Sequence, residues 1–524
     1  MIKFFQTKRI PQPHYAIFLT GIFLLVGAFT AAHHEMWRDE IQAWLLARDS
    51  SSLMDLFRNL KYEGHPGLWH VCLMPLSRIT KSPVIMQVFH LLIAATTVYL
   101  FARYAPFNSL QKFLFAFGYF PLYEYAIVCR NYALGVLLIC LFCILFQHRY
   151  TTFQIAGAEL SRFLLIGAIL FLLGHTSAHC LIITMVTGFA LFLDHLFTRK
   201  GILATGQMDE RQIWIGFGLI AFGIITSVLQ LNPPSDTGFA VPWRWSYDAD
   251  YLKDIIRIMT RAFFPIPEAK LHFWGSQWLG KYPVFTSIQL RLSYLLIIWS
   301  SLILLRKPTA LLIYLGGTIG LLSFFYVKYF GSMRHHGFLF MLFIMATWIY
   351  RYCAEIKYFT PINLLNGILG KSLSPVLTLI LTIHLIGGIT AVRMDRRHVF
   401  SYGKKTAEYI KAQSMQDMLM VGEVDYAVST VVGYLEKDNI YYMRGNRLGS
   451  FVRWDNARTH DVSVDEIIQK TREIRDEHKQ EVLMILNKAL NKDQISGNAL
   501  TELTNFTTST IGDEGFYLYL MRED

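Results

Sequence analysis

The chain has 524 residues, of which 53% are hydrophobic, 15% are aromatic and only 17% are charged. Soluble domains carry about 25% charged residues. This composition, with a mean hydropathy of +0.35, therefore predicts a membrane protein and excludes disordered, collagen-like and disulfide-framework classes. We attribute the net charge of +11 to the basic loops that set membrane topology and to contact with the lipid surface. No basic cluster interleaved with aromatic residues suggests a nucleic-acid partner.

The first apolar run covers residues 15–32 and follows Lys3, Lys8 and Arg9. A secretory signal peptide begins in a similar way. Because many apolar runs follow, we expect instead a retained first helix with a cytoplasmic N-terminus. The further runs lie near residues 84–102, 112–128, 133–147, 161–174, 178–196, 212–230, 287–305, 308–327, 337–350 and 373–391. The sequence thus predicts a polytopic α-helical membrane protein with about eleven transmembrane helices.

This orientation makes the short cytoplasmic loops basic, as the positive-inside rule requires. Two long loops, 33–83 and 231–286, and everything after residue 391 then lie outside a bacterial-type inner membrane. We expect a transmembrane domain over residues 1–391 and an extracytoplasmic domain over residues 392–524. Most of the tryptophans fall in the outer segments, which suggests that the loops lie at the membrane interface.

The composition changes after residue 392, where the charge rises and long apolar runs stop. Strands are predicted at 418–423, 439–444, 450–454, 481–487 and 515–522, and helices at 402–413, 463–477 and 498–505. This alternation predicts a small α/β domain. It contains no GxGxxG, P-loop or nucleophile-elbow motif, so we expect it to cap or to recognise a ligand and not to catalyse.

The first outer loop opens with the segment HHEMWRDE, residues 33–40. Adjacent carboxylates at the end of a membrane helix have an unfavourable free energy unless they are solvated or have a functional role. Alternatively, Asp39 and Glu40 simply begin an interfacial helix whose dipole favours them. A capping box at Ser52 predicts a short surface helix over 52–61. The segment YEGHPGLWH, residues 62–70, then turns the chain back toward the bilayer and gathers carboxylates and imidazoles at one place.

This arrangement resembles the GT-C superfamily of membrane glycosyltransferases, which includes the protein mannosyltransferase, aminoarabinose transferase and RgtA-like groups. The resemblance covers the architecture of nearly the whole chain, from the acidic pair after the first span to the C-terminal domain. At residue level it rests on the segments WRDE, residues 37–40, and EGHPGLW, residues 63–69. Related families commonly place a second proline after the His-Pro pair, where this chain has Gly67, so the subfamily stays open.

The resemblance implies a sugar donor linked to a polyprenyl phosphate and a hydroxyl acceptor on a glycan, a glycolipid or a protein. Asp39 aligns with the acid that acts on the acceptor, either as a general base or as a ligand of a divalent cation, and Glu40 would support it. His65 of the His-Pro turn is expected to contact substrate. We expect inversion at the anomeric carbon, because no second carboxylate is evidently placed as a nucleophile.

Other polar residues are predicted at the outer membrane edge. Arg130 is expected to bind the donor phosphate, or else to snorkel or pair with Glu124. With Tyr132 it forms an Arg-x-Tyr element similar to one in protein mannosyltransferases. His175 and His179 have the i, i+4 spacing that can place two imidazoles on one helix face, as a metal pair requires. Without an HExxH pattern, substrate hydrogen bonding or simple interfacial exposure is the preferred interpretation.

The predicted outer turn over residues 326–337 is basic, which the positive-inside rule does not predict for this face, so we expect these charges to have a function. We expect Arg334, Lys328 and His335 to bind the donor phosphate, with attraction to anionic lipid head groups as the alternative. In the loop 231–286, Trp243 and Arg244 are candidates for substrate binding, because aromatic planes stack on sugar rings. They also suit an interfacial anchor.

Two other classes of function stay open from the sequence. A transporter or lipid flippase also has many spans with polar residues, although no internal repeat relates the two halves. A non-catalytic protein that binds glycolipid and organises partners is the third possibility. In every case the lipid bilayer is a partner.

Overall fold

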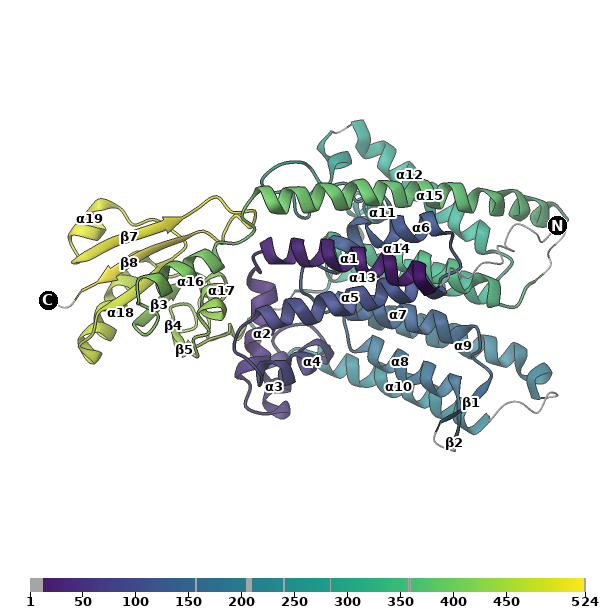
Figure 1. Ribbon diagram of the computed structural model, residues 1–524, viewed down its shortest axis with the longest axis horizontal. Coiled ribbons are helices and arrows are strands. Elements are labelled where there is room, and N and C mark those ends of the chain that lie inside the picture. The colour runs from purple at the N-terminus through teal and green to yellow at the C-terminus, as the bar shows by residue number, and fades with distance from the viewer. Residues whose placement is uncertain are drawn as a thin grey trace.

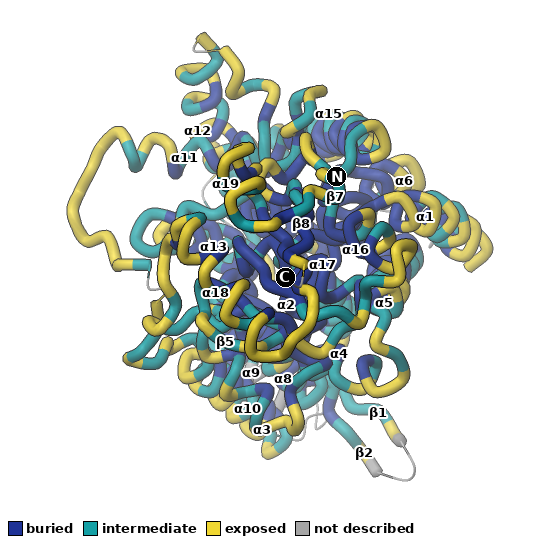
Figure 2. Tube along the Cα trace, turned by 90° about the vertical axis from the view of Figure 1, so that its left-hand side faces the viewer, coloured by how far each residue is buried: buried dark blue, intermediate teal, exposed yellow. Residues whose placement is uncertain are grey.

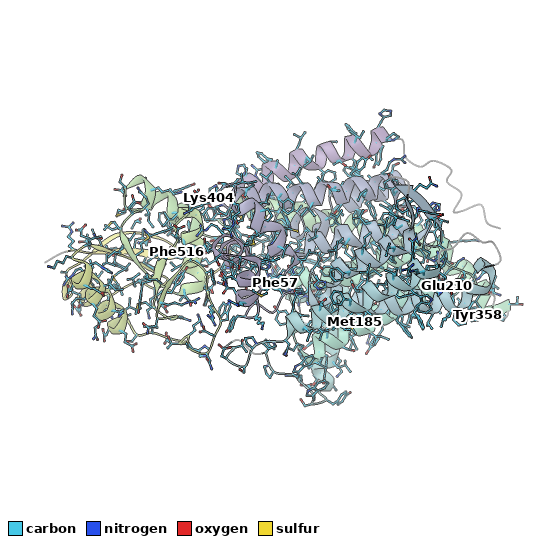
Figure 3. All side chains as sticks on the ribbon, turned by 90° about the horizontal axis from the view of Figure 1, so that it is seen from below. Phe57, Met185, Glu210, Tyr358, Lys404 and Phe516 are labelled. Atoms are coloured by element: carbon cyan, nitrogen blue, oxygen red, sulfur yellow. The ribbon has the colours of Figure 1, made fainter. Side chains whose placement is uncertain are left out.

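The computed structural model describes residues 13–155, 158–203, 210–238, 241–282, 284–356, 358 and 360–522. It consists of a helical region followed by a smaller domain with a β-sheet, which lies at one end of the helices (Figure 1). We call this end of the helical region the domain-proximal end. Lys404 and Phe57 lie near the junction of the two parts, and Glu210 and Tyr358 lie toward the opposite end (Figure 3).

Within the residues that the structure describes, seven helices are long and apolar enough to cross a membrane, judged by length and composition. An apolar helix of about 20 residues covers the roughly 30 Å of a bilayer core. The seven are α1 (Pro13–His33), α5 (Val84–Tyr104), α9 (Ala178–Leu203), α10 (Glu210–Leu231), α12 (Val284–Leu304), α13 (Pro308–Val327) and α15 (Thr360–Arg397). The prediction of a multi-pass membrane protein is confirmed at this level.

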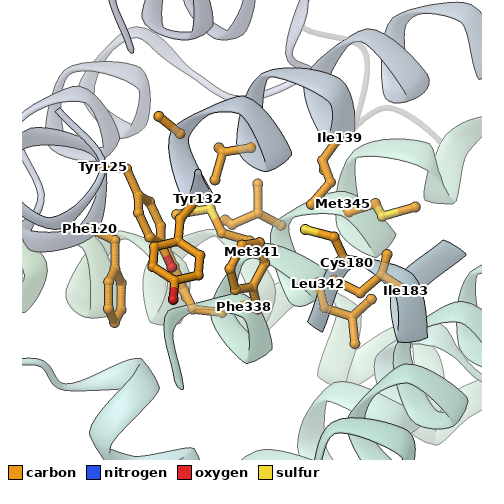
Figure 4. Close-up of a cluster of buried hydrophobic side chains, with 14 of the residues drawn as sticks. Phe120, Tyr125, Tyr132, Ile139, Cys180, Ile183, Phe338, Met341, Leu342 and Met345 are labelled. Atoms are coloured by element: carbon orange, nitrogen blue, oxygen red, sulfur yellow. The ribbon is translucent and has the colours of Figure 1, made fainter. Parts of the chain in front are cut away.

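Shorter apolar helices fill the space between the long ones. They are α4 (Leu68–Ser77), α7 (Tyr132–Phe146), α8 (Arg162–Gly174) and α14 (Met333–Ile349). All seventeen residues of α14 are buried, so this helix lies at the centre of the helical region. Its side chains interlock with those of α7 and α9 in the cluster that contains Ile139, Cys180 and Met345 (Figure 4).

The span predicted over 112–128 is not one helix. Helix α6 (Ser109–Ala116) ends early, and a buried π-helical turn, η2 (Tyr119–Glu124), follows it. Pro121 has no backbone N–H to continue an α-helix. A side chain at Gly118 would come within 3.0 Å of His384 in α15, so the chain passes α15 closely at this break.

Both predicted outer loops contain helices. Residues 33–83 contain α2 (Arg38–Asp49), α3 (Leu53–Leu60) and α4. Half of the predicted capping box forms, since the Ser52 side chain accepts a hydrogen bond from the Asp55 backbone N–H. The Asp55 carboxylate accepts from the Ser51 N–H instead of returning a bond to Ser52. Residues 231–286 contain the amphipathic helix α11 (Ala249–Phe263) and the short 3-10 helix η3 (Trp278–Lys281). The tryptophans of these loops differ in solvent exposure: Trp44 and Trp69 are buried, whereas Trp245 is exposed.

Three small elements complete the helical region. The strands β1 (Thr152–Ile155) and β2 (Ala158–Ser161) form an antiparallel hairpin. A 3-10 turn, η4 (Tyr350–Tyr352), follows α14. The hairpin lies at the end of the helices opposite the C-terminal domain (Figure 1).

The C-terminal domain is a six-stranded mixed sheet with helices, in the strand order β5-β4-β3-β6-β8-β7. The strands are β3 (Leu419–Glu423), β4 (Ile440–Tyr442), β5 (Arg447–Gly449), β6 (Val482–Leu486), β7 (Leu500–Phe506) and β8 (Phe516–Met521). The helices are α16 (Gly403–Ala412), α17 (Asp425–Leu435), α18 (Val464–His478) and α19 (Lys492–Ser496). Strand β3 runs parallel to β4 and β6, and the other pairs are antiparallel.

Two predictions for this domain are wrong, and one helix was missed. Residues 498–505 form no helix but strand β7, which pairs with β8. The strand predicted at 450–454 is absent, and β5 lies a few residues earlier. Helix α17 was not predicted, because it is buried on nearly all sides and its apolar, β-branched sequence shows no 3.6-residue period.

The C-terminal domain packs on α2 through α17 (Figure 2). Gly433 of α17 lies against Ile41 with no room for a larger side chain. The Gln42 amide donates to the Val452 carbonyl at 2.7 Å and accepts from the Val452 N–H at 3.0 Å. The Tyr434 hydroxyl accepts a bond from the Met36 N–H at 2.8 Å. Helix α2 is therefore held between the two parts of the protein.

Candidate active site

The Asp39 carboxylate, in the first turn of α2, lies between two guanidinium groups. Arg334 Nη2 lies 3.2 Å from Asp39 Oδ2, and Arg130 Nη1 lies 3.9 Å from the same oxygen. Arg130 also donates a hydrogen bond to the Asp39 backbone carbonyl. The Asp39 side chain is 30% exposed, compared with 11% for Arg130 and 10% for Arg334. Solvent therefore reaches the carboxylate best. We call these three residues the acid–arginine site.

Four helix N-termini meet around this site. Asp39 lies in the first turn of α2, Tyr132 begins α7, His179 follows the first residue of α9, and Arg334 follows the first residue of α14. Contacts of the Asp39, Tyr132 and His179 side chains with Arg334 or His335 join these helix ends. Helix N-termini present free N–H groups and a partial positive charge. Together with the two guanidinium groups, they make this place favourable for an anionic ligand.

The Arg334 side chain is fixed by aromatic neighbours. Its guanidinium carbon lies 5.0 Å from the Trp274 ring centroid and 5.5 Å from that of Trp37. The Tyr125 hydroxyl donates a hydrogen bond to the Arg334 carbonyl at 2.8 Å. Stacking on aromatic planes suits guanidinium better than ammonium. Arg334 is therefore held in one orientation toward Asp39.

Tyr132 and His335 form a pair whose protons can be assigned. His335 Nδ1 accepts a hydrogen bond from the Ser332 N–H at 2.8 Å, so in the neutral ring the proton sits on Nε2. That Nε2–H donates to the Tyr132 hydroxyl oxygen at 2.7 Å. The Tyr132 hydroxyl hydrogen is then left for another acceptor. Figure 4 shows Tyr132 beside Tyr125 and Phe338.

His65, from the predicted His-Pro turn, joins the site through Arg130. Arg130 Nη2 lies 3.1 Å from His65 Nε2. Burial and then the charge of Arg130 hold the pKa of His65 well below its usual range, so the ring is neutral. His65 Nε2 accepts the bond from Arg130, and the proton therefore sits on Nδ1, which is buried and has no partner among the described residues.

A second carboxylate, Glu63, lies in the same turn. Its Oε1 accepts a hydrogen bond from the Gln42 amide at 2.8 Å. Burial raises the pKa of Glu63 to about 7, and the charges of Arg130 and Asp39 act on it in opposite directions. Glu63 is therefore a group that can exchange a proton near neutral pH close to the acid–arginine site.

Glu40, which was predicted to support Asp39, is fully buried and fixes the position of α2 through its hydrogen bonds. Its Oε1 accepts from the Cys129 N–H, and its Oε2 accepts from the Trp37 N–H at 3.1 Å. His34 Nε2 lies 3.2 Å from the same Oε2, and His34 Nδ1 lies 3.0 Å from Asp395 Oδ2 in α15. Burial lowers the pKa of His34, but the charges of Asp395 and Glu40 outweigh it and raise this pKa to about 10. A buried imidazolium thus ties α2 to α15.

Lys328, Trp243 and Arg244 lie together in a separate pocket of about 290 Å³. Lys328 Nζ donates to the Val241 carbonyl at 2.5 Å and lies 4.7 Å from the Trp243 ring centroid. None of these three residues contacts the acid–arginine site directly. The pocket borders the site at Tyr329, which lines the pocket and whose ring centroid lies 5.4 Å from that of His335, the neighbour of Arg334.

The two histidines predicted as a possible metal pair do not share a helix face. His175 follows the end of α8, and His179 lies in α9. His175 Nδ1 lies 2.8 Å from the Phe171 carbonyl and its Nε2 lies 3.0 Å from the Thr226 hydroxyl, so both ring nitrogens are engaged. His179 stacks on His335 with 4.8 Å between ring centroids. Among the described residues, no group of three or more His, Cys, Asp or Glu side chains is placed to hold a metal ion.

Sequence reasoning missed four residues around the site. Trp37 and Trp274 flank Arg334, Glu63 lies behind His65, and Tyr329 connects the pocket. Glu63 belongs to the segment EGHPGLW that carries the family resemblance, so a signal for it was present. Trp37 belongs to the segment WRDE, which also carries the resemblance, whereas Trp274 had only the general signature of an interfacial anchor.

No protein-family model matches the chain, and no curated protein is significantly similar to it. The chemistry of the site therefore has to be argued from its own residues.

Proposed function

We propose that this chain is a membrane glycosyltransferase of the GT-C type, which moves a sugar from a polyprenyl-phosphate donor to a hydroxyl group on a glycan, a glycolipid or a protein. The observation that carries the proposal is the acid–arginine site, where one accessible carboxylate lies between two guanidinium groups at converging helix N-termini. Such a site combines a proton acceptor with a place for a phosphate.

The proposed reaction is a single displacement. The acceptor oxygen attacks the anomeric carbon while its proton passes to an Asp39 carboxylate oxygen. The bond between the anomeric carbon and the donor phosphate oxygen breaks, and its electron pair stays on the phosphate. Arg334 and Arg130 stabilise the charge of the leaving polyprenyl phosphate, for which the guanidinium fork is suited. This sequence inverts the anomeric configuration.

The neighbouring polar groups have supporting roles in this proposal. The free hydroxyl hydrogen of Tyr132 and the unpartnered Nδ1–H of His65 are donors for the phosphate or for sugar hydroxyls. The aromatic and cationic pocket that contains Trp243 and Lys328 suits a sugar ring next to a phosphate. The divalent cation left open by the resemblance would have Asp39 as its acidic ligand, but no described cluster supports it.

The proposal also includes topology. We infer that α7, α8, α14 and the broken segment of α6 and η2 bring the number of spans to about eleven. We also infer that the N-terminus is cytoplasmic and that the site and the C-terminal domain face outward. The domain-proximal end carries the charged site residues, whereas a transporter or flippase would place them near the middle of the bilayer. This distribution favours an interfacial enzyme.

The decisive experiment compares Asp39→Asn with the native protein in proteoliposomes that contain undecaprenyl-phosphate-linked hexoses. Loss of the base should lower the release of undecaprenyl phosphate by about 10² to 10⁴-fold, with unchanged thermal unfolding. Asp438→Asn is the matched control, because it removes an exposed carboxylate at the same end of the protein. Full activity of Asp39→Asn would overturn the mechanism.

A second test asks for the donor itself. Native mass spectrometry of the protein, gently extracted from its own membrane, should show a bound isoprenoid phosphate that carries a sugar. The mass would also identify the sugar. Arg130→Gln combined with Arg334→Gln should lose this adduct, because the phosphate would lose both guanidinium partners.

A further inference from the structure

A groove of about 810 Å³ runs along the helical region between α1, α6 and α15, away from the acid–arginine site. These three helices lie together in the view along the molecule (Figure 2). Most of the groove wall is apolar and includes Val26, Phe117 and Ile389. Its volume is within the roughly 300–1,000 Å³ of small-molecule sites, and such a wall suits a hydrocarbon chain.

One end of this groove is strongly basic. Arg393, Arg396 and Arg397, in the last two turns of α15, line it. All three are exposed, and none forms an ion pair within the part of the chain that the structure describes. Arg396 lies 4.6 Å from the ring centroid of Phe29 in α1. The arginines therefore stand together beside the domain-proximal end of α1, with their charge uncompensated.

The apolar wall and the basic end form one continuous strip. Ile389, Arg393 and Arg396 have the i, i+4, i+7 spacing of one helix face. If α15 spans the bilayer, this strip passes from hydrocarbon depth to the level of the lipid head groups. The groove thus matches a molecule with an apolar chain and an anionic head.

The groove faces away from the reacting groups. Asp395, two residues after Arg393 and therefore on the other side of α15, is buried and bonds to His34. A ligand on the arginines is thus separated from Asp39 by α15 and its buried contacts. This position does not suit the donor of the proposed reaction.

We propose that this groove binds one acidic phospholipid, with an acyl chain between α1 and α15 and the phosphodiester on the three arginines. Three unpaired guanidinium groups complement an anionic head and offer several donors to its phosphate oxygens. A zwitterionic lipid would bring its own cation to the same place. This assignment does not depend on the proposed transferase activity.

The test is native mass spectrometry of the full-length protein in detergent, titrated with equal amounts of phosphatidylglycerol or phosphatidylcholine. We expect one phosphatidylglycerol to bind at least five-fold more tightly than phosphatidylcholine. The triple variant R393Q/R396Q/R397Q should lose this preference. A control variant, R472Q/K479Q/K492Q, removes the same charge from exposed positions of the C-terminal domain and should keep it.

A second variant separates a seated lipid from general surface attraction. V26F/I389F fills the apolar part of the groove without changing any charge and should lower phosphatidylglycerol binding at least five-fold. Unchanged binding by this variant, or by the triple arginine variant, would overturn the proposal. Tighter binding of undecaprenyl phosphate than of phosphatidylglycerol at the same site would overturn the choice of a glycerophospholipid. Thermal unfolding of each variant checks that the fold is retained.

Discussion

At the scale of single residues, the position of Asp39 depends on partners that are far away in sequence. Its carboxylate pairs with Arg334, which lies 295 residues later, and with Arg130, which lies 91 residues later. The sequence marked each of the three as unusual, because each is a charge at a predicted membrane edge. It could not show that they meet, since no local pattern encodes a contact between separate helix ends.

Arg334 gives a prediction that depends on shape as well as charge. Arg334→Lys keeps the positive charge but loses the plane that lies against Trp37 and Trp274. We expect the KM for the polyprenyl-phosphate donor to rise about ten-fold, which corresponds to roughly 1.4 kcal/mol, while Arg334→Gln should cost more. Steady-state kinetics in proteoliposomes measures this, with Arg472→Lys as the control. An unchanged KM for both Arg334 variants would remove Arg334 from phosphate binding.

His34 gives a prediction about pH. Its pKa in the folded protein is raised to about 10 from an ordinary value of 6.5, because Asp395 and Glu40 outweigh burial. The imidazolium therefore contributes stability that is fully present below pH 6.5 and is lost as the pH rises through about 10. The melting temperature of the native protein should exceed that of His34→Gln clearly at pH 6 and much less at pH 10.

The control for this pH series is His33→Gln, because the His33 ring bonds to the Phe29 carbonyl and, among the described residues, forms no ion pair with a carboxylate. Its melting temperature should differ from that of the native protein by a similar amount at every pH. If the difference in melting temperature between the native protein and His34→Gln does not decrease as the pH rises, His34 is not charged in the folded protein.

At the scale of elements, α2 is positioned from two sides. Glu40 ties it to α15 through His34, and Gln42 ties it to the C-terminal domain. A charged, partly exposed acid at a helix start is otherwise prone to move, because helix ends fray easily. The rigid placement of Asp39 is therefore a property of the contacts of α2 and not of its own sequence.

Gln42→Ala tests this holding of α2. The variant leaves the Val452 N–H and carbonyl without their partner, which costs about 1–3 kcal/mol for each buried group. We expect a lower melting temperature and a loss of activity of several-fold. Gln469→Ala, which removes an exposed amide of the C-terminal domain, is the control. Equal activity of Gln42→Ala and the native protein would show that Asp39 does not need this contact.

The elements also show where sequence patterns succeed. The cap at Ser52 was predictable because capping is a local hydrogen bond. Strand β7 was not, because its identity depends on pairing with β8, and the buried helix α17 carries no amphipathic period. The break at Gly118 was not predicted, because it lies inside an apolar run and hydropathy does not indicate where a helix is interrupted.

At the scale of the whole molecule, the two parts form one unit around α2. The multi-pass character followed from composition and apolar run length alone. The α/β nature of the C-terminal domain followed from the change in periodicity after residue 392. The way in which that domain covers α2 could not be predicted, since it depends on the fit of surfaces such as Gly433 against Ile41.

Removal of the C-terminal domain tests this unit. A chain that ends after residue 397 should still insert into the membrane, because the seven long apolar helices are intact. It should lose at least ten-fold in activity and melt at a lower temperature, since Gln42 of α2 would lose Val452, and Met36, just before α2, would lose the Tyr434 hydroxyl. Insertion is measured by fractionation and activity in proteoliposomes. Native activity of the truncated chain would show that the domain has no role in placing Asp39.

Helix α15 connects the bilayer to α2, so a change in the tilt of α15 would move α2. Its 38 residues extend about 57 Å at 1.5 Å per residue, nearly twice the roughly 30 Å of a bilayer core. A helix longer than the bilayer adjusts its tilt to the local thickness. Asp395 near its end is bonded to His34 and so to Glu40, and the C-terminal domain begins directly after it. A thicker or thinner membrane should therefore displace Asp39, so that bilayer thickness would regulate the reaction proposed for this site.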